Sequence, residues 1–196
     1  MSVVKLTSTQ SGGTGFQVKY DGRQFTLTNY HICMLADDRN ELKSEDYFGN
    51  TRKLKVIKRY LKNDLCVLEP IPYLPAIRLA NSYYMHEQVY LVGHPRLEAL
   101  TMQTASLVSK RTITLRMPRK LEDPCNNEED TSHPSYWTYQ IHYCYDKFVA
   151  LHSNVISYGG NSGSPVIDDF GNLVGVLFAG NRSYVTNYYI VQLEYI

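Results

Sequence analysis

A serine in a loop rich in small residues is the first sign of chemistry in this chain of 196 residues. The segment SYGGNSGSPVID, residues 157–168, places Ser162 beside Gly159, Gly160 and Gly163. Glycines permit a sharply folded loop in which several backbone N–H groups converge beside one hydroxyl. Such a loop suits acyl transfer if a base activates the hydroxyl and a third group orients that base. Because a loop serine is more often a turn residue, the interpretation depends on finding those two partners.

His31 and Asp64 have the types and positions that the serine needs. The segment FTLTNYHIC places His31 at the end of an apolar strand, and KNDLCVLEP places Asp64 at the start of another. A partly buried carboxylate is costly unless it accepts strong hydrogen bonds, which an imidazole N–H supplies. His31, Asp64 and Ser162 therefore fit a general base, an orienting carboxylate and a nucleophile. Each of these signals is weak alone, but together with the glycine loop they point specifically to nucleophilic catalysis by a serine.

The elements that must position these residues are mostly short strands. In residues 15–32, apolar residues alternate with polar ones on both sides of Asp21-Gly22, which predicts a hairpin. Further strands are expected at residues 52–60, 64–70, 88–94, 100–109, 111–117, 135–145, 162–168 and 173–180. Only residues 31–42 have helical spacing, over a short length. The pattern predicts an all-β barrel or sandwich.

Composition excludes some classes of protein and leaves others open. Hydrophobic residues make up 43% of the chain and charged residues 20%, which is typical of a globular protein. A net charge of +1 favours no polyanionic partner, and no apolar run is long enough to span a membrane. The four cysteines have no paired spacing, so we expect free thiols and a reducing, cytoplasmic location; an oxidised Cys125–Cys144 pair stays open.

Residues 118–135 interrupt the strand pattern. They contain three prolines and a cluster of acids, which predicts an exposed loop, with partner contact or substrate gating as alternatives to a solvated insertion. Cys125, His133, His142 and Cys144 recur in and after this loop, and the last two share one face of a strand. Because their spacing matches no zinc pattern with paired ligands, we interpret them as core and loop side chains. We expect no metal and no organic cofactor.

A basic stretch is the main feature that could suit nucleic acid. It contains six cations in eleven positions, namely Arg52, Lys53, Lys55, Lys58, Arg59 and Lys62. They alternate with Leu54 and Val56, as in a strand that keeps one face wet and protects a sheet edge. No aromatic stacking platform accompanies them, so nucleic acid binding is not favoured.

The chain as a whole resembles the trypsin-like serine proteases of the chymotrypsin fold, especially HtrA-type enzymes and those that process viral polyproteins. The resemblance is carried by GGTGFQV, TLTNYHI, NDLCVLEP, VYLVGHP, TASLVS and GGNSGSPVIDDFGNLVGV. It implies a single domain over residues 1–196 made of two six-stranded antiparallel β-barrels, at about 1–85 and 86–196, with the active site between them. It also implies a catalytic triad of His31, Asp64 and Ser162, and an oxyanion hole of the Gly160 and Ser162 N–H groups.

The resemblance further implies a protein or peptide substrate and a specificity pocket. The segments VISYGG and VLFAGN would wall the pocket, with candidate substrate-binding residues Ile156, Ser157, Leu177, Phe178, Ala179 and Gly180. Ile156, six residues before Ser162, provides no acid for a Lys or Arg side chain, so we expect cleavage after small or medium apolar residues. Many relatives have a hydroxyl near the position of Phe178, close to the aspartate, which leaves open how Asp64 is held.

Two alternatives belong to other functional classes. A binding module can keep this fold without catalysis, because fold alone does not fix activity. A protein- or RNA-interaction domain would instead use the basic stretch. A reactive serine distinguishes the first hypothesis from both.

Overall fold

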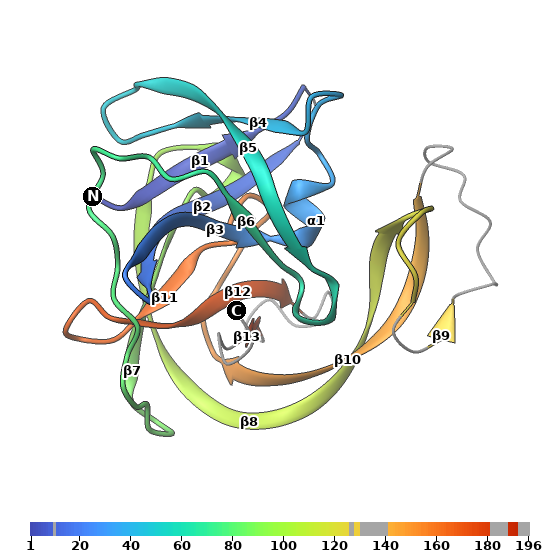
Figure 1. Cartoon of the computed structure of the whole chain (residues 1–196). Helices are drawn as coiled ribbons and strands as arrows, with labels where there is room; N and C mark the ends of the chain where they lie inside the picture. The colour runs from blue at the N-terminus through green and yellow to red at the C-terminus, as the bar shows by residue number, and fades with distance from the viewer. Residues whose placement is uncertain (10, 126–127, 130–140, 181–187, 192–196) are drawn as a thin grey trace.

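The first half of the chain forms a closed β-barrel. The computed structural model describes residues 1–9, 11–125, 128–129, 141–180 and 188–191. The barrel strands are β1 (Val3–Thr7), β2 (Gly12–Tyr20), β3 (Arg23–Asn29), β4 (Glu41–Glu45), β5 (Thr51–Tyr60) and β6 (Leu65–Leu68). They pair antiparallel in the order β1-β2-β3-β6-β5-β4 (Figure 1). Helix α1 (Tyr30–Cys33) follows β3, and the short 3-10 helix η1 (Leu61–Asn63) precedes β6.

The β2–β3 hairpin shows how the sequence closes this barrel. Asp21 and Gly22 both adopt positive φ, at 47° and 73°, which is the turn that matches the twist of the two strands. Across the hairpin, Phe16 pairs with Leu27, and all three of Phe16, Val18 and Leu27 are fully buried. The predicted hairpin is confirmed, although the polar residues Gln17 and Thr26 between the apolar ones are buried too.

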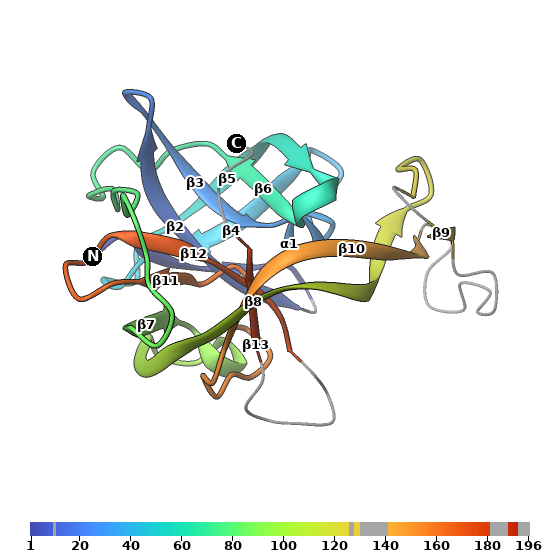
Figure 2. The same ribbon diagram turned by 90° about the horizontal axis from the view of Figure 1, so that it is seen from below.

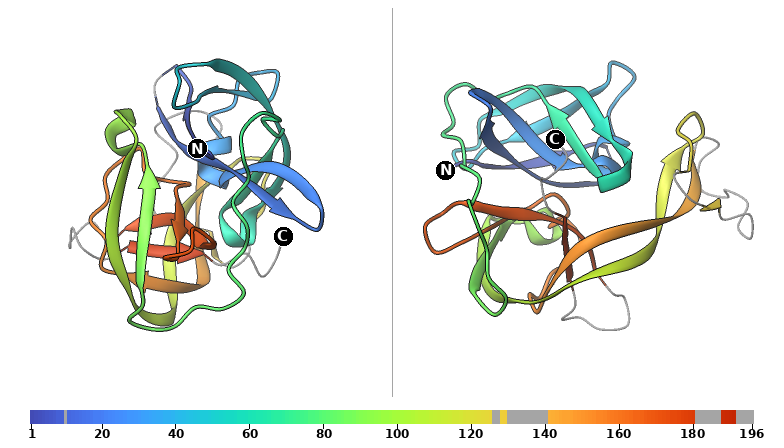
Figure 3. Two further views of the ribbon diagram at one scale, coloured as in Figure 1. Left: turned by 90° about the vertical axis from the view of Figure 1, so that its left-hand side faces the viewer. Right: turned by 60° about the horizontal axis from the view of Figure 1, so that its bottom comes forward.

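The second half forms a curled antiparallel sheet. Its elements are β7 (Gln88–Gly93), η2 (Pro95–Leu97), β8 (Thr101–Lys120), β9 (Glu128–Glu129), β10 (Ile141–Ser153), β11 (Pro165–Ile167), β12 (Leu173–Gly180) and β13 (Tyr188–Val191). The strand order is β13-β12-β11-β7-β8-β10-β9, and β13 also pairs with β10, so the sheet curls back on itself (Figure 3). The predicted all-β fold is confirmed, with six strands in the first barrel as expected, whereas the second sheet has seven strands among the described residues.

The two barrels share one hydrophobic cluster. Barrel-one residues such as Phe16 and Leu65 pack in it with barrel-two residues such as Phe148 and Phe178. The connecting segment, residues 69–87, also touches both barrels, because Ile77 bridges to β2 and Leu79 bridges to β12. The predicted division near residues 85–86 lies in this segment.

Strands β8 and β10 form a longer ribbon than the sequence predicts. The two strands expected at 100–109 and 111–117 are one continuous strand, and β10 extends to Ser153. The ribbon runs past the second barrel toward the α1 end of the first (Figure 2). The loop predicted from residue 118 starts only after Lys120, because residues 118–120 pair with β10 and Arg119 is fully buried. Residues 126–127 and 130–140 lie outside the described part of the chain, so His133 does too.

Two local predictions are wrong for packing reasons. The helical segment expected at 31–42 is helical only over Tyr30–Cys33, because the Asp37 carboxylate accepts N–H groups of Arg39 and Glu41 and turns the chain into β4. The basic strand β5 keeps its cations on the outer face as predicted. It protects no sheet edge, however, because β4 and β6 pair with it on both sides.

The cysteines contradict the prediction of free thiols. Cys33 is bonded to Cys66, and Cys125 to Cys144, which leaves no free cysteine. Cys66 lies opposite Thr28 on β3, and one turn of α1 brings Cys33 back to it, so the first pair depends on the barrel and not on sequence spacing. The expected reducing compartment loses the observation on which it rested. Within the described residues, no helix has the length and apolarity needed to cross a membrane.

Candidate active site

His31 and Asp64 form a hydrogen-bonded pair at the end of the first barrel. Strands β3 and β6 are neighbours, so His31, just after β3, lies beside Asp64, just before β6. The His31 ring Nδ1 lies 2.7 Å from Asp64 Oδ2, and the His31 backbone N–H donates to Oδ1 over 3.0 Å. Asp64 is fully buried, whereas the His31 side chain is 21% exposed. Because a carboxylate accepts, Nδ1 carries the proton and Nε2 has the lone pair.

The Asp64 backbone is held by the two residues that precede His31. Asp64 adopts a left-handed conformation, with φ 50° and ψ 40°. Its carbonyl accepts the Tyr30 N–H over 2.9 Å and the Asn29 side-chain amide over 3.1 Å. These contacts fix the carboxylate relative to the imidazole, and among the described residues only His31 donates to the carboxylate itself.

Some N–H groups of the loop around Ser162 donate to backbone carbonyls, and others do not. The N–H groups of Asn161, Gly163 and Ser164 all donate to backbone carbonyls. Those of Gly160 and Ser162 donate to no group in the part of the chain that the structure describes. N–H groups without an internal acceptor, at and near the nucleophile, are what an oxyanion hole requires.

Gly160 is required by its conformation and by its neighbours. Its φ is +95°, which side chains rarely adopt. A Cβ at this position would lie 2.3 Å from the His94 carbonyl oxygen and 2.7 Å from the Leu97 nitrogen. The η2 segment therefore packs directly on the loop and leaves room only for glycine.

Thr14 on β2 joins this loop to the first barrel. Its hydroxyl donates to the Gly160 carbonyl over 2.8 Å and accepts the His94 N–H over 3.0 Å. Its backbone N–H donates to the Ser162 carbonyl over 2.8 Å. The Thr28 hydroxyl donates in turn to the Thr14 carbonyl over 2.7 Å. Thr14 is fully buried, so this network is shielded from water.

The contacts of Thr14 also bring the Ser162 loop to the end of β3, just before His31. A Cβ on Gly163 would lie 2.3 Å from the Thr28 hydroxyl and 3.2 Å from the Asn29 nitrogen. Asn29 is two residues before His31. The structure thus gathers His31 and Asp64 of the first barrel and the Ser162 loop of the second at the junction of the barrels.

The predicted pocket residues fall into two groups. Ile156 is 45% exposed, and Ser157 is buried beside it in the chain. Leu177 is buried in the core of the second barrel, and Phe178 packs on Phe148 with ring centroids 5.0 Å apart. The side chains of Leu177 and Phe178 are therefore committed to packing.

The end of β12 is defined by its backbone pairing. Ala179 and Gly180 pair with Tyr189 and Tyr188 of β13. Leu177 bonds on its other side to the Ser162 loop, because its carbonyl accepts the Gly163 N–H over 2.9 Å. The strand that follows the serine is therefore fixed to the serine loop through main-chain contacts.

Arg119 is a residue at this site that the sequence prediction missed. It is fully buried on β8, forms an ion pair with Asp146 of β10, and donates to the Leu61 carbonyl over 2.9 Å. Its guanidinium lies 5.1 Å from the centre of the Tyr30 ring. Leu61 and Tyr30 precede Asp64 and His31, so the ribbon supports both segments. An arginine in a region of turn residues gave no signal of burial.

Tyr30 ties the loop after β8 to the helix of His31. Its hydroxyl donates to the Asp123 carboxylate. Burial, reinforced by this carboxylate, raises the pKa of Tyr30, so the hydroxyl stays a donor throughout the ordinary pH range. The same loop carries Cys125, which with His142 and Cys144 makes up the group of potential metal ligands found among the described residues.

Comparison with known proteins gives one family and one fold. The family described as the trypsin-like peptidase domain matches residues 13–176. The active form of the Rv3671c protease from M. tuberculosis superposes with a TM-score of 0.71 at 21% identity, covering 98% of this chain and 76% of that one. The HtrA-type protease AlgW with tripeptide superposes with a TM-score of 0.69 at 18% identity, covering 97% of this chain and 56% of that one. The serine endoprotease from Yersinia pestis superposes with a TM-score of 0.68 at 16% identity, covering 97% of this chain and 58% of that one. A search of curated sequences found no match.

Proposed function

The chain belongs to the trypsin-like peptidase family, and on this premise we propose that His31, Asp64 and Ser162 are the catalytic triad of a serine endopeptidase. The observation that carries the assignment is the 2.7 Å hydrogen bond between His31 Nδ1 and the buried Asp64 carboxylate. It fixes the tautomer in which Nε2 can accept a proton. The docking of the Ser162 loop beside the strand of His31 supports the choice of nucleophile.

The chemistry follows from these roles. Ser162 Oγ attacks the carbonyl carbon of the scissile peptide while His31 Nε2 takes the hydroxyl proton. His31 then gives that proton to the leaving amine, and an acyl-enzyme remains on Ser162. A water molecule, activated by the same imidazole, hydrolyses the ester and restores the serine. Asp64 holds the ring and stabilises the imidazolium at each step.

The negative charge of the tetrahedral intermediate needs its own donors. The N–H groups of Gly160 and Ser162 suit this role, because they donate to no other group within the described chain. Loss of one such donor costs about 10²–10³ in kcat in enzymes of this kind. The conformation of Gly160 therefore matters for rate as well as for packing.

The substrate is a protein or peptide, which we propose is cleaved after small or medium apolar residues. Ile156, at the predicted base of the pocket, is exposed and apolar. A Lys or Arg side chain placed against it would lose water without gaining a carboxylate, which is unfavourable. Gly180 on β12 leaves room for an extended peptide to pair with the backbone.

Labelling with a fluorophosphonate probe tests the triad, because the probe reacts only with an activated serine. We expect the wild-type chain to be labelled, S162A to be unlabelled, and S164A to be labelled as the matched control. The Ser164 hydroxyl is buried and has no hydrogen bond among the described residues, so its removal should disturb the loop little. Thermal unfolding should show that S162A folds normally.

Two outcomes would overturn parts of this assignment. Labelled S162A would exclude Ser162 as the nucleophile, and an unlabelled but folded wild-type chain would favour a catalytically inactive binding module. A peptide library tests the substrate class separately: dominant cleavage after Lys, Arg, Gln or Glu would exclude the apolar preference, and cleavage after Val, Leu, Ala or Met would support it.

A further inference from the structure

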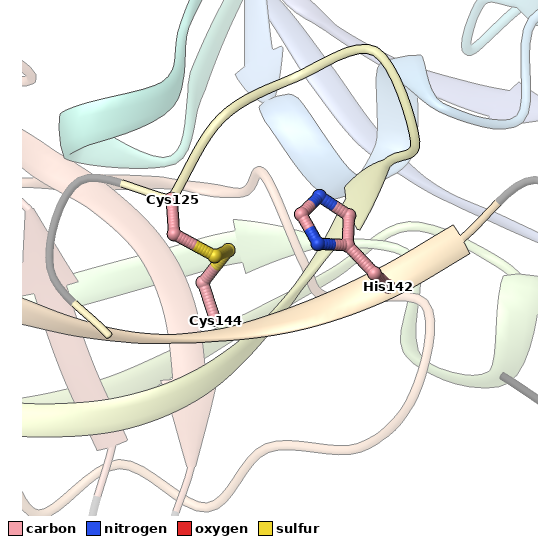
Figure 4. A group of neighbouring side chains, drawn as sticks. All are labelled: Cys125, His142 and Cys144. Atoms are coloured by element: carbon pink, nitrogen blue, oxygen red, sulfur yellow. A yellow bond between two sulfur atoms is a disulfide. The ribbon is translucent and has the colours of Figure 1, made fainter. Parts of the chain in front are cut away.

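Three side chains with metal-ligating atoms meet on the β8–β10 ribbon. His142 and Cys144 lie two residues apart on β10 and so point to the same face of the strand. Cys125, in the loop after β8, faces them (Figure 4). One ligating atom from each residue lies within 4.8 Å of the others. Two sulfurs and an imidazole at this spacing are the donor set of a zinc site.

The hydrogen bond of His142 orients its ring as a metal ligand. Nε2 lies 2.8 Å from the Asp123 carbonyl oxygen. Because a carbonyl only accepts, Nε2 carries the proton and Nδ1 has the lone pair. Figure 4 shows a ring nitrogen turned toward the two sulfurs. Metal-binding histidines typically donate their second ring N–H to a carbonyl or carboxylate in this way.

We propose that Cys125, His142 and Cys144 bind one Zn²⁺ ion when their disulfide is reduced. In the oxidised chain, Cys125 and Cys144 are bonded to each other, with their Cα atoms 5.4 Å apart. A tetrahedral zinc ion with Zn–S bonds of about 2.3 Å holds two sulfurs about 3.8 Å apart. Rotation about the two Cα–Cβ bonds separates the sulfurs to this distance without moving the backbone. Water completes the fourth position.

The reduction and the binding step balance separately. A phosphine reductant removes the disulfide with one water molecule, giving the phosphine oxide and two thiols. Zn²⁺ then replaces the two thiol protons, which pass to the buffer, and His142 Nδ1 adds its lone pair. The site is neutral overall, because two thiolates balance the ion. Such a site suits a partly buried position.

The zinc ion would replace the disulfide as the link between the loop and β10. The same loop carries Asp123, whose carboxylate accepts the Tyr30 hydroxyl just before His31. Without a disulfide or a metal, the loop would be joined to β10 by weaker contacts. The expected consequence is a reduced chain that is more heat-stable with Zn²⁺ than without it.

Zinc binding to the reduced protein tests the proposal without any activity measurement. The wild-type chain would be reduced with a phosphine, incubated with zinc chloride and desalted, and its zinc content measured by elemental analysis. We expect one zinc ion per chain, and none in the oxidised chain. Co²⁺ in place of zinc should give thiolate charge-transfer absorption and the strong visible bands of a tetrahedral site.

Two variants locate the ion. H142A keeps both thiols and should bind zinc at least about 10-fold more weakly, the effect that loss of even a supporting residue has at a metal site. The matched control is C33S/C66S, which removes the other cysteine pair and should keep one zinc ion per chain. Equal affinity in H142A, loss of zinc from C33S/C66S only, or no zinc in the reduced wild type would each overturn the proposal.

Discussion

Replacing Thr14 by valine should uncouple the serine loop from the first barrel. Valine has nearly the same shape as threonine but no hydroxyl, so T14V removes the bonds to the Gly160 carbonyl and the His94 N–H and keeps the packing. The backbone bond from Thr14 to the Ser162 carbonyl remains. The change therefore isolates the contribution of one hydroxyl to the position of Gly160.

The expected cost follows from the burial of Thr14. Two buried polar groups lose their partner, at about 1–3 kcal/mol each. A protein of this size loses about 2–4 °C in Tm per kcal/mol, so the fall should be at least about 4 °C. Because Gly160 is the proposed oxyanion donor, kcat should fall more than KM changes.

The assay compares T14V with T14S, which keeps the hydroxyl and loses a methyl group. Both would be measured by thermal unfolding, and by peptide hydrolysis well below the Tm of T14V. We expect T14S to resemble the wild type and T14V to lose both stability and kcat. Wild-type kcat and Tm in T14V, or equal defects in the two variants, would refute the role assigned to the hydroxyl.

Three further changes test other contacts. R119M leaves the Asp146 carboxylate buried without its partner, which should lower the free energy of unfolding by about 3–5 kcal/mol. The double variant R119M/D146L should regain the Tm but not kcat, because the bond from Arg119 to the Leu61 carbonyl stays lost. Full recovery of kcat in the double variant would contradict this role of Arg119. Burial lowers the pKa of His94 below its ordinary 6.5, so on acidification the unfolded chain binds the proton before the folded chain does. The Tm should therefore fall as the pH drops below about 6.5, and H94Q should make the Tm depend less on pH in this range. The same pH dependence of Tm in H94Q would refute the assignment to His94. C33S/C66S removes a cross-link between residues 33 positions apart, which should lower the free energy of unfolding by about 3–4 kcal/mol. Urea unfolding measures this, and a loss below about 1 kcal/mol would show that the disulfide contributes little to stability.

The two residues of the pair at the end of the first barrel could be recognised because the signal for each of them is local. His31 ends one apolar strand and Asp64 begins another, and neighbouring antiparallel strands bring such positions together. The alternation around Asp21-Gly22 likewise states the hairpin in consecutive residues. Periodicity and turn chemistry determine the hairpin, whereas the meeting of His31 and Asp64 also requires the pairing of β3 with β6, which the sequence resemblance implies and the local pattern does not.

The contacts that secure the site could not be predicted in this way. Thr14 and Gly160 are far apart in sequence, and Arg119 reaches Leu61 from the other barrel. Nothing near Arg119 in the sequence shows that its charge is buried, since its partner Asp146 lies beyond a long loop. The failure of the free-thiol prediction has the same origin, because Cys33 meets Cys66 only through the pairing of β3 with β6.

The sequence resemblance left open how Asp64 is held, because Phe178 stands near the position where many relatives have a hydroxyl. Phe178 lies in the hydrophobic cluster that also contains Leu65, the residue after Asp64, and Asp64 itself is fully buried. Both carboxylate oxygens instead accept hydrogen bonds from His31, one from its ring and one from its backbone. A carboxylate in dry surroundings attracts a nearby cation more strongly than one in water. In the proposed mechanism His31 takes the proton of the nucleophile, so this attraction increases at that step and favours the transition state over the resting enzyme.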